Sequence, residues 1–293
     1  MLVVATVLVA SLAAAHFVVA GLVKPLPAHP FWSGVAPRVI AHRGGRGLWP
    51  ENTLYAFRRA LELGADVLEM DLRRSVDGEL VVLHDATVDR TTDGSGPVAA
   101  LGVAQLKRLD AGYRWTSDSG ASFPYRGHGI AIPMLREVFR ALPQARLNLE
   151  IKPGYPGMER QLCDLIRAYR MEARVAVASV EQEPMDGFRA ACPEVATAAT
   201  KDEVLSFVRW SRLFLAPLAE PRAAAFQVPE RVGSLDLVTP GFAGDAHQLN
   251  MKLEVWTVNE PRDMQRLLAL PVDGIMTDYP DRLLGLLGRL ERQ

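Results

Sequence analysis

Three short segments of the sequence end runs of aliphatic residues with side chains that bind protons, metals or anions. They are 41–44 (AHRG), 68–71 (LEMD) and 82–85 (VLHD). Because aliphatic runs of this length belong inside strands, the pattern predicts that chemistry is concentrated at one rim of a parallel sheet. Any one of these residues alone is more often an ordinary charged residue at a strand end. Their concentration within 39–85 favours a functional site.

Paired carboxylates indicate a cation. Glu69 and Asp71 are two residues apart, which in a strand places both on the same face, where they repel each other unless a cation or a shared proton intervenes. Glu150 ends a later aliphatic run and adds a third oxygen ligand. Oxygen ligands suit Mg²⁺ or Ca²⁺ rather than zinc, so we expect one divalent cation of this kind.

His42 and His84 stand beside these carboxylates at strand ends. A lone strand-end histidine is usually a hydrogen-bonded structural residue. Two of them next to three carboxylates favour an acid/base pair, because imidazole titrates near neutral pH. Which of the two is the acid is left open.

The chain carries an ordered set of short motifs. They are 42–44 (HRG), 50–53 (PENT), 69–71 (EMD), 77–78 (DG), 84–85 (HD), 150–152 (EIK), 256–259 (WTVN) and 274–278 (GIMTD). This set resembles the glycerophosphodiester phosphodiesterase family, and the resemblance covers roughly residue 38 to the C-terminus. A further segment, 132–139 (IPMLREVF), is similar to the membrane-associated, lysophospholipase D-like branch of that family.

The resemblance implies hydrolysis of glycerophosphodiesters to glycerol 3-phosphate and an alcohol, with Glu69, Asp71 and Glu150 as the metal ligands. The resemblance further implies that a neighbouring hydroxyl of the substrate attacks phosphorus and that water then opens the cyclic phosphate. A direct attack by metal-activated water would use the same residues. The alternative substrate is a lysophospholipid, from which a lysophospholipase D releases the headgroup alcohol. Arg43, as a planar two-pronged donor, and Lys152, as a point charge, would bind the phosphate.

Several other residues are given supporting roles. Glu51 and Asn52 are expected to hold Arg43 and the first loop in place. Trp256 is interpreted as a wall for the alcohol moiety of the substrate or as a buried barrel residue. Asp278 is interpreted as structural, and the Asp- and Gly-rich stretch 89–96 as a turn, because its spacing is not that of an EF-hand.

Two other classes of function remain open. One is a barrel enzyme that uses Lys152 to form a Schiff base, which requires a lysine with a depressed pKa. The nearby Glu150 opposes that. The other is a protein that binds phospholipid headgroups without turnover, which would not require two histidines placed for proton transfer.

The elements that would position these residues alternate between short strands and amphipathic helices from residue 38 onward, which predicts an α/β fold, a (β/α)8 TIM barrel over 38–293. Nine strands compete for eight places, and 195–199 is the first to be dropped for its weak β character. The short connection 73–78 leaves one crossover without a helix. Residues 86–132 form an insertion after the third strand, expected to act as a lid or substrate platform. The strands are expected over 39–42, 67–71, 80–84, 147–152, 175–179, 195–199, 235–239, 254–258 and 274–277, and the helices over 53–63, 135–141, 158–169, 202–210, 245–251, 262–268 and 282–290.

The N-terminal segment 1–23 contains no charged side chain and is long enough to cross a bilayer, so we interpret it as a transmembrane anchor. A cleaved signal peptide is the alternative, although no Lys or Arg precedes the apolar run. Residues 24–37 are rich in proline and predict a stiff linker. Positive charges only on the C-terminal side favour a cytoplasmic catalytic domain on a membrane-anchored protein.

The composition excludes some partners. The 293 residues carry 33 Lys and Arg against 34 Asp and Glu, a net charge of −1, so no basic surface for nucleic acid is predicted. The two cysteines are far apart and lack metal-binding spacing, so neither a zinc site nor a disulfide is expected, and Cys163 is placed in the core. The substrate, a glycerophosphodiester or a lysophospholipid, and the membrane are the expected partners. The oligomeric state is left open.

Overall fold

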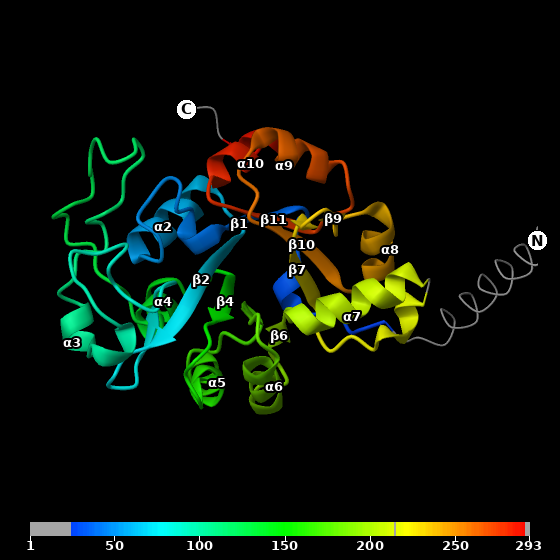
Figure 1. The fold of residues 1–293 in the computed structure, drawn as a ribbon, viewed down its shortest axis with the longest axis horizontal. Coiled ribbons are helices and arrows are strands. Elements are labelled where there is room, and N and C mark those ends of the chain that lie inside the picture. The colour runs from blue at the N-terminus through cyan, green and yellow to red at the C-terminus, as the bar shows by residue number, and fades with distance from the viewer. Residues whose placement is uncertain (1–24, 214, 291–293) are drawn as a thin grey trace, which may run out of the picture.

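The fold is a barrel of eight parallel strands with helices around the outside, seen in Figure 1 in a computed structural model that describes residues 25–213 and 215–290. The strands follow the order β6-β5-β4-β2-β1-β11-β10-β7. The ring is closed by a parallel bridge between Ala198, just beyond β6, and Ala225 of β7. The barrel strands are β1 (Arg38–Ala41), β2 (Val67–Arg74), β4 (Leu147–Ile151), β5 (Val175–Ala178), β6 (Ala196–Thr197), β7 (Ala225–Pro229), β10 (Lys252–Trp256) and β11 (Gly274–Thr277).

Each barrel strand is followed by a helix, which completes the (β/α)8 pattern. The first helix begins as expected, because the Thr53 side chain accepts a hydrogen bond from the backbone N–H of Ala56 and so caps it. The helix that follows β5 was not predicted. These helices are α2 (Leu54–Leu63), α4 (Leu135–Ala141), α5 (Met158–Ala168), α6 (Gln182–Ala191), α7 (Lys201–Arg212), α8 (Pro240–Gln248), α9 (Pro261–Leu268) and α10 (Pro280–Leu286).

The remaining short elements lie at the barrel base, in the loops and in the insertion. They are the 3-10 turns η1 (Pro30–Trp32), η2 (His42–Gly44), η3 (Val98–Ala100) and η4 (Ala216–Ala219), the helix α3 (Val103–Leu106), and the strands β3 (Leu80–Val82), β8 (Arg231–Val232) and β9 (Leu235–Asp236).

The choice of barrel strands differs from the sequence prediction. β3 pairs antiparallel with the far end of β2 and stays outside the ring, because the connection between them is a tight turn with Gly78 at φ 86°. The expected crossover without a helix is therefore a hairpin. The predicted strand 195–199, which was the first to be dropped, contributes the barrel strand β6. The predicted strand 235–239 is not a barrel strand, and its first residues form part of the β8–β9 hairpin. β7 was missed because Gln227 and Pro229 interrupt its apolar pattern.

The base of the barrel is closed by the segment expected to be a linker. Phe31 of η1 is fully buried, and its carbonyl accepts a hydrogen bond from the guanidinium of Arg38. The indole N–H of Trp32 donates to Glu254 on β10. Instead of standing away from the globular part, Phe31 and Trp32 of this segment pack against the strands at the base of the barrel.

The insertion has a small apolar core of its own. Val88, Val98 and Leu106 pack with β3 into a cluster separate from the main core. The aromatic residues of the insertion are not part of this cluster. The Trp115 ring packs on Tyr125, which in turn packs on Tyr55 of α2. The insertion is therefore attached to the barrel by aromatic contacts at the side of α2.

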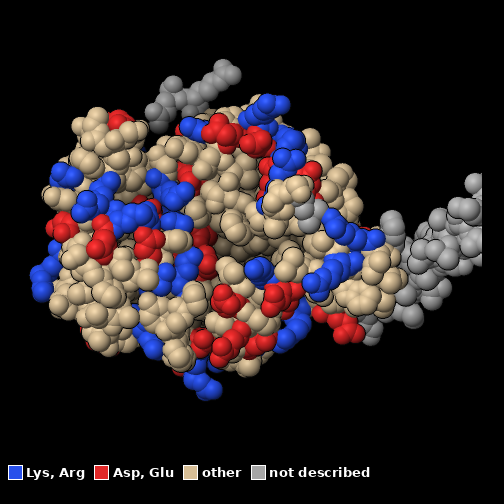
Figure 2. Space-filling view, viewed as in Figure 1, with Lys and Arg blue, Asp and Glu red and all other residues tan. Residues whose placement is uncertain are grey.

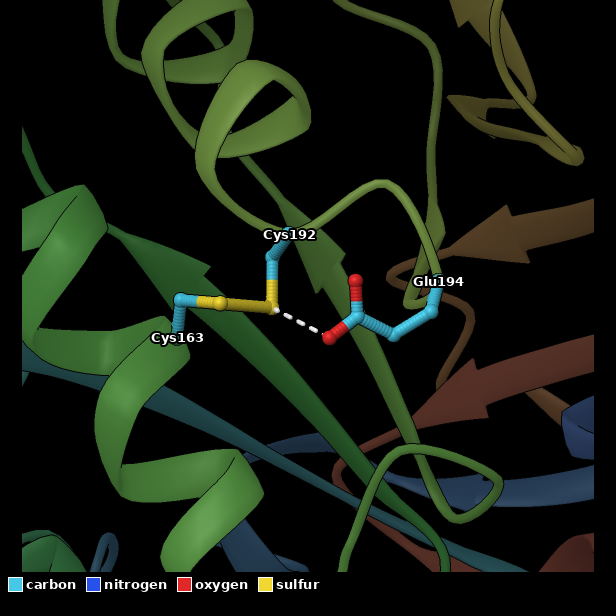
Figure 3. A group of neighbouring side chains, drawn as sticks. All are labelled: Cys163, Cys192 and Glu194. Atoms are coloured by element: carbon cyan, nitrogen blue, oxygen red, sulfur yellow. Dashed lines mark hydrogen bonds between the residues drawn. A yellow bond between two sulfur atoms is a disulfide. The ribbon is translucent and has the colours of Figure 1, made fainter.

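A disulfide joins α5 to the end of α6, contrary to the expectation of none. Cys163 and Cys192 are 29 residues apart in the sequence and 5.5 Å apart between Cα atoms. Figure 3 shows the bond, with the Glu194 carboxylate beside the Cys192 sulfur. The two helices pack side by side, and without a predicted α6 nothing in the sequence placed these cysteines together. Because both sulfurs are bonded, this trio offers no thiolate ligand for a metal.

No helix among residues 25–213 and 215–290 is long and apolar enough to cross a membrane. This finding contradicts the predicted membrane-anchored location, which is not retained. The anchor was predicted for 1–23, which lies outside the described residues.

Candidate active site

Three carboxylates meet at the C-terminal rim of the barrel. β2 presents Glu69 and Asp71 on one face, and the parallel register places Glu150 of β4 opposite Asp71. One oxygen of each of the three carboxylates lies within 4.8 Å of the others. Glu69 and Asp71 are buried, and burial together with the charges of Asp71 and Glu150 raises the pKa of Glu69 well above its usual value. This set of repelling oxygens fits a divalent cation.

Lys152 lies between two of these carboxylates. Its Nζ is 2.9 Å from Asp71 Oδ1 and 2.7 Å from Glu150 Oε1. Although burial alone would lower the pKa of Lys152, the charges of Asp71 and Glu150 raise it above its usual value. The ammonium is therefore kept protonated, which opposes the Schiff-base hypothesis.

Arg43 reaches the cluster from the turn that follows β1. Its backbone N–H donates to Glu69 Oε2 at 2.8 Å, and its Nη1 donates to Glu51 Oε1 at 2.9 Å. The turn requires a glycine next, because Gly44 has φ 81° and a Cβ there would lie 2.8 Å from the ring of Phe57. Buried Arg43 Nε has no hydrogen-bond partner among the described residues, but it lies 3.4 Å from Asp71 Oδ2, so the guanidinium is also paired with a predicted metal ligand.

His42 is held by a carboxylate that directly follows the last barrel strand, β11. Its Nδ1 is 2.6 Å from Asp278 Oδ1, and its Nε2 faces Glu69 Oε2 at 3.9 Å. Asn259 fixes Asp278 by donating from Nδ2 at 2.8 Å and accepting from the Asp278 backbone N–H at 2.9 Å. Asp278 therefore orients His42. The sequence interpretation as structural missed this, although the position after a strand end was a signal.

His84 has the same arrangement on the other side of the site. Its Nδ1 is 2.6 Å from Asp85 Oδ1. In both histidines a carboxylate occupies Nδ1, which leaves Nε2 as the nitrogen that can exchange a proton with a substrate. Sequence spacing gave no indication that Asp278 and Asp85 would have matching roles.

The remaining predicted site residues are also at the rim. The Asn52 side chain donates to Asp71 Oδ2 at 2.8 Å, and its backbone N–H donates to the Arg43 carbonyl at 2.9 Å. It thus contacts a predicted metal ligand as well as the first loop. Trp256 is the last residue of β10 and is 40% exposed, so it is not a buried barrel residue.

Two arginines absent from the sequence prediction contact the site. Arg46 Nε is 2.9 Å from Asp278 Oδ1, and its carbonyl accepts a hydrogen bond from the Trp115 indole at 3.0 Å. Arg90 bridges Asp85 and Glu51. In Figure 2, basic and acidic side chains gather over the side of α2 and β2, beside a hollow at the centre of this face. Singly placed arginines have no spacing pattern, so only the fold could identify them.

Comparisons with known proteins identify the family of this chain. The Glycerophosphoryl diester phosphodiesterase family matches residues 42–282. A glycerophosphodiester phosphodiesterase of Caldanaerobacter subterraneus is 36% identical over 85% of this chain and 96% of its own. Lysophospholipase D GDPD1 of Rattus norvegicus is 26% identical over 84% of each chain.

Among solved structures, an Oleispira antarctica phosphodiesterase in complex with the product sn-glycerol-3-phosphate is similar to this chain. It has a TM-score of 0.67 and 26% identity over 86% of this chain and 97% of its own. The family match spans seven of the eight barrel strands, all but β1, and it includes every predicted site residue. The chain therefore belongs to the glycerophosphoryl diester phosphodiesterase family and is a phosphoric diester hydrolase.

Proposed function

We propose that the protein hydrolyses glycerophosphodiesters to glycerol 3-phosphate and an alcohol, with a divalent cation and two histidines that transfer protons. The observation that carries the proposal is the carboxylate cluster of Glu69, Asp71 and Glu150, whose oxygens lie within 4.8 Å of one another beside two imidazoles with carboxylate-bound Nδ1 atoms. The product named for the Oleispira antarctica relative supports the same reaction.

The three carboxylates would hold the cation, Mg²⁺ or Ca²⁺. When bound, it neutralises charge on the non-bridging phosphate oxygens. Arg43 and Lys152 add to this neutralisation, Arg43 through its planar guanidinium beside Asp71 and Lys152 as a point charge beside Asp71 and Glu150. Asn52 holds Asp71 in place for this role.

His42 and His84 move the protons. One imidazole takes the proton from the attacking hydroxyl, of the substrate or of water, as the new P–O bond forms. The other gives a proton to the departing alkoxide as the old P–O bond breaks. Where the attacking hydroxyl belongs to the substrate, the product of this step is a cyclic phosphate, and water then opens it to glycerol 3-phosphate with the same two histidines taking and returning the protons. Asp278 and Asp85 keep each imidazole in the tautomer that directs Nε2 into the site. The two roles are not assigned to individual histidines.

A lysophospholipid is the second candidate substrate, and the aromatic stack at the rim favours it. The Trp115 indole donates a hydrogen bond to the Arg46 carbonyl, and its ring packs on Tyr125. An aromatic surface therefore lies next to the turn after β1 that carries His42 and Arg43. Each acyl methylene buried there would contribute about 0.8 kcal/mol. The similarity to the rat lysophospholipase D supports this candidate.

The test is choline release by the full chain from glycerophosphocholine and, separately, from lysophosphatidylcholine. Release from glycerophosphocholine supports the main proposal, and a preference for the acylated substrate that is lost in Trp115→Ala supports the second. Phe123→Ala is the matched control, because Phe123 packs under Arg126 on the insertion itself. Tight binding of either compound without choline release would leave only the headgroup-binding hypothesis.

A further inference from the structure

Arg90, at the start of the insertion, lies between two carboxylates and uses both edges of its guanidinium. Its Nε is 2.6 Å from Asp85 Oδ2, and its Nη2 is 3.3 Å from Asp85 Oδ1. Its Nη1 and Nη2 donate to the two oxygens of Glu51 at 2.8 and 2.7 Å. Only a planar fork of donors can hold two carboxylates in this way, so lysine is not an equivalent.

The contacts continue on both sides of Arg90. Asp85 accepts from His84, and Glu51 accepts from Arg43. The result is a row of alternating charges that begins at a histidine proposed for proton transfer and ends at an arginine proposed for phosphate binding. These two groups come from different loops, and Arg90 is the member of the row that joins the two halves.

We propose that Arg90 is a positioning residue that fixes His84 and Arg43 relative to each other for phosphodiester cleavage. The inference rests on the proposed function and extends it to the insertion, whose chain supplies Arg90. Without the guanidinium, Asp85 and Glu51 lose their common partner and repel each other. Both His84 and Arg43 would then be held by carboxylates that no longer have a fixed place.

The charge state of Asp85 agrees with this role. Although partial burial alone would raise the pKa of Asp85, the hydrogen bonds from Arg90 and His84 lower it to about 2. Asp85 is therefore an acceptor throughout the neutral range, and the Nδ1–H tautomer of His84 is maintained.

The first experiment measures choline release from glycerophosphocholine by wild type, Arg90→Gln and Arg90→Lys. We expect both variants to lose at least ~10-fold in kcat, the lower range for residues that orient catalytic groups, while KM changes by less than about threefold. Arg108→Gln is the matched control, because Arg108 is an exposed arginine of the same insertion without an ion pair among the described residues. It should keep wild-type kinetics.

Two further measurements separate positioning from a general loss of structure. Added guanidinium should raise the activity of Arg90→Ala and leave the activities of wild type and Arg108→Gln unchanged. In a double-mutant cycle, the double variant Arg90→Gln with Asp85→Asn should be no less active than the less active of the two single variants. Both changes interrupt the same row of contacts between His84 and Arg43, so their effects should not add.

Near-normal kcat in Arg90→Gln, independent additive losses in the cycle, or full activity in Arg90→Lys would each overturn the inference. A loss of activity that parallels a loss of folding in thermal melting would assign Arg90 a structural role and overturn it as well. An inactive wild type would refute the proposed function and this inference together. An active wild type with an unaffected Arg90→Gln would refute this inference alone.

Discussion

The two ends of the barrel bury charges in opposite ways. At the base, Arg38 and Glu254 form one ion pair, with side chains 4% and 1% exposed. The Glu254 carboxylate also accepts hydrogen bonds from two neutral groups, the indole of Trp32 and the amide of Gln227. At the rim, three carboxylates lie together, and the only positive charges that contact them among the described Lys and Arg side chains are Lys152 and Arg43, the latter also paired with Glu51. A balanced buried set holds the structure together, whereas a surplus of like charge indicates a ligand that completes it.

The difference between the two ends predicts that removal of divalent cations has the largest effect on activity, because only the rim carboxylates need a cation. We expect a chelator to abolish hydrolysis of glycerophosphocholine and added Mg²⁺ or Ca²⁺ to restore it, because the rim carboxylates then lack the charge that completes them. Choline release in metal-depleted buffer is the measurement, and Glu69→Gln should weaken metal binding in calorimetry. Full activity in excess chelator would end the metal proposal.

The same substitution, Glu to Gln, at each end of the barrel compares how much each buried carboxylate contributes to stability. Glu254→Gln leaves Arg38 buried without its partner and should lower the free energy of unfolding by about 3 kcal/mol, with folded protein still active. Glu69→Gln, measured in chelator, should leave stability unchanged or raised, because it relieves repulsion among the three carboxylates. Urea unfolding gives both values. Equal losses from the two variants would show that the ends do not differ.

Replacement of either histidine should act on turnover alone. His42→Ala and His84→Ala should each lose at least ~10²-fold in kcat, the usual size of an acid/base contribution, while the metal still binds. Steady-state kinetics with calorimetric metal titration is the measurement. A variant that keeps near-normal turnover would remove that histidine from the proposed mechanism.

The smallest effect is expected at the exposed aromatic residue of the rim. Trp256→Ala should raise KM by up to about tenfold, equivalent to about 1.4 kcal/mol, with little change in kcat, because it removes a contact to the alcohol moiety and no charged group. Kinetics on glycerophosphocholine measure this. An unchanged KM would mean that Trp256 does not contact the substrate.

The fold could be predicted in class but not in strand order. Alternation of strands and helices indicated the barrel, and most helix positions agree. The sequence could not select the eight strands, because β6 with Ala196 and Thr197 is two residues long and β7 carries Gln227 and Pro229, so both have weak β patterns. Their places are decided by closure of the ring, a long-range requirement.

The sequence by itself determined which strand ends carry the chemistry, because period-two alternation and parallel pairing bring Glu69, Asp71 and Glu150 to one rim. Only the tertiary structure decided what holds these groups in place. Asp278 lies 236 residues from His42, and Arg90 lies 39 residues from Glu51. Such partners depend on where loops meet in space, and no local propensity encodes that meeting.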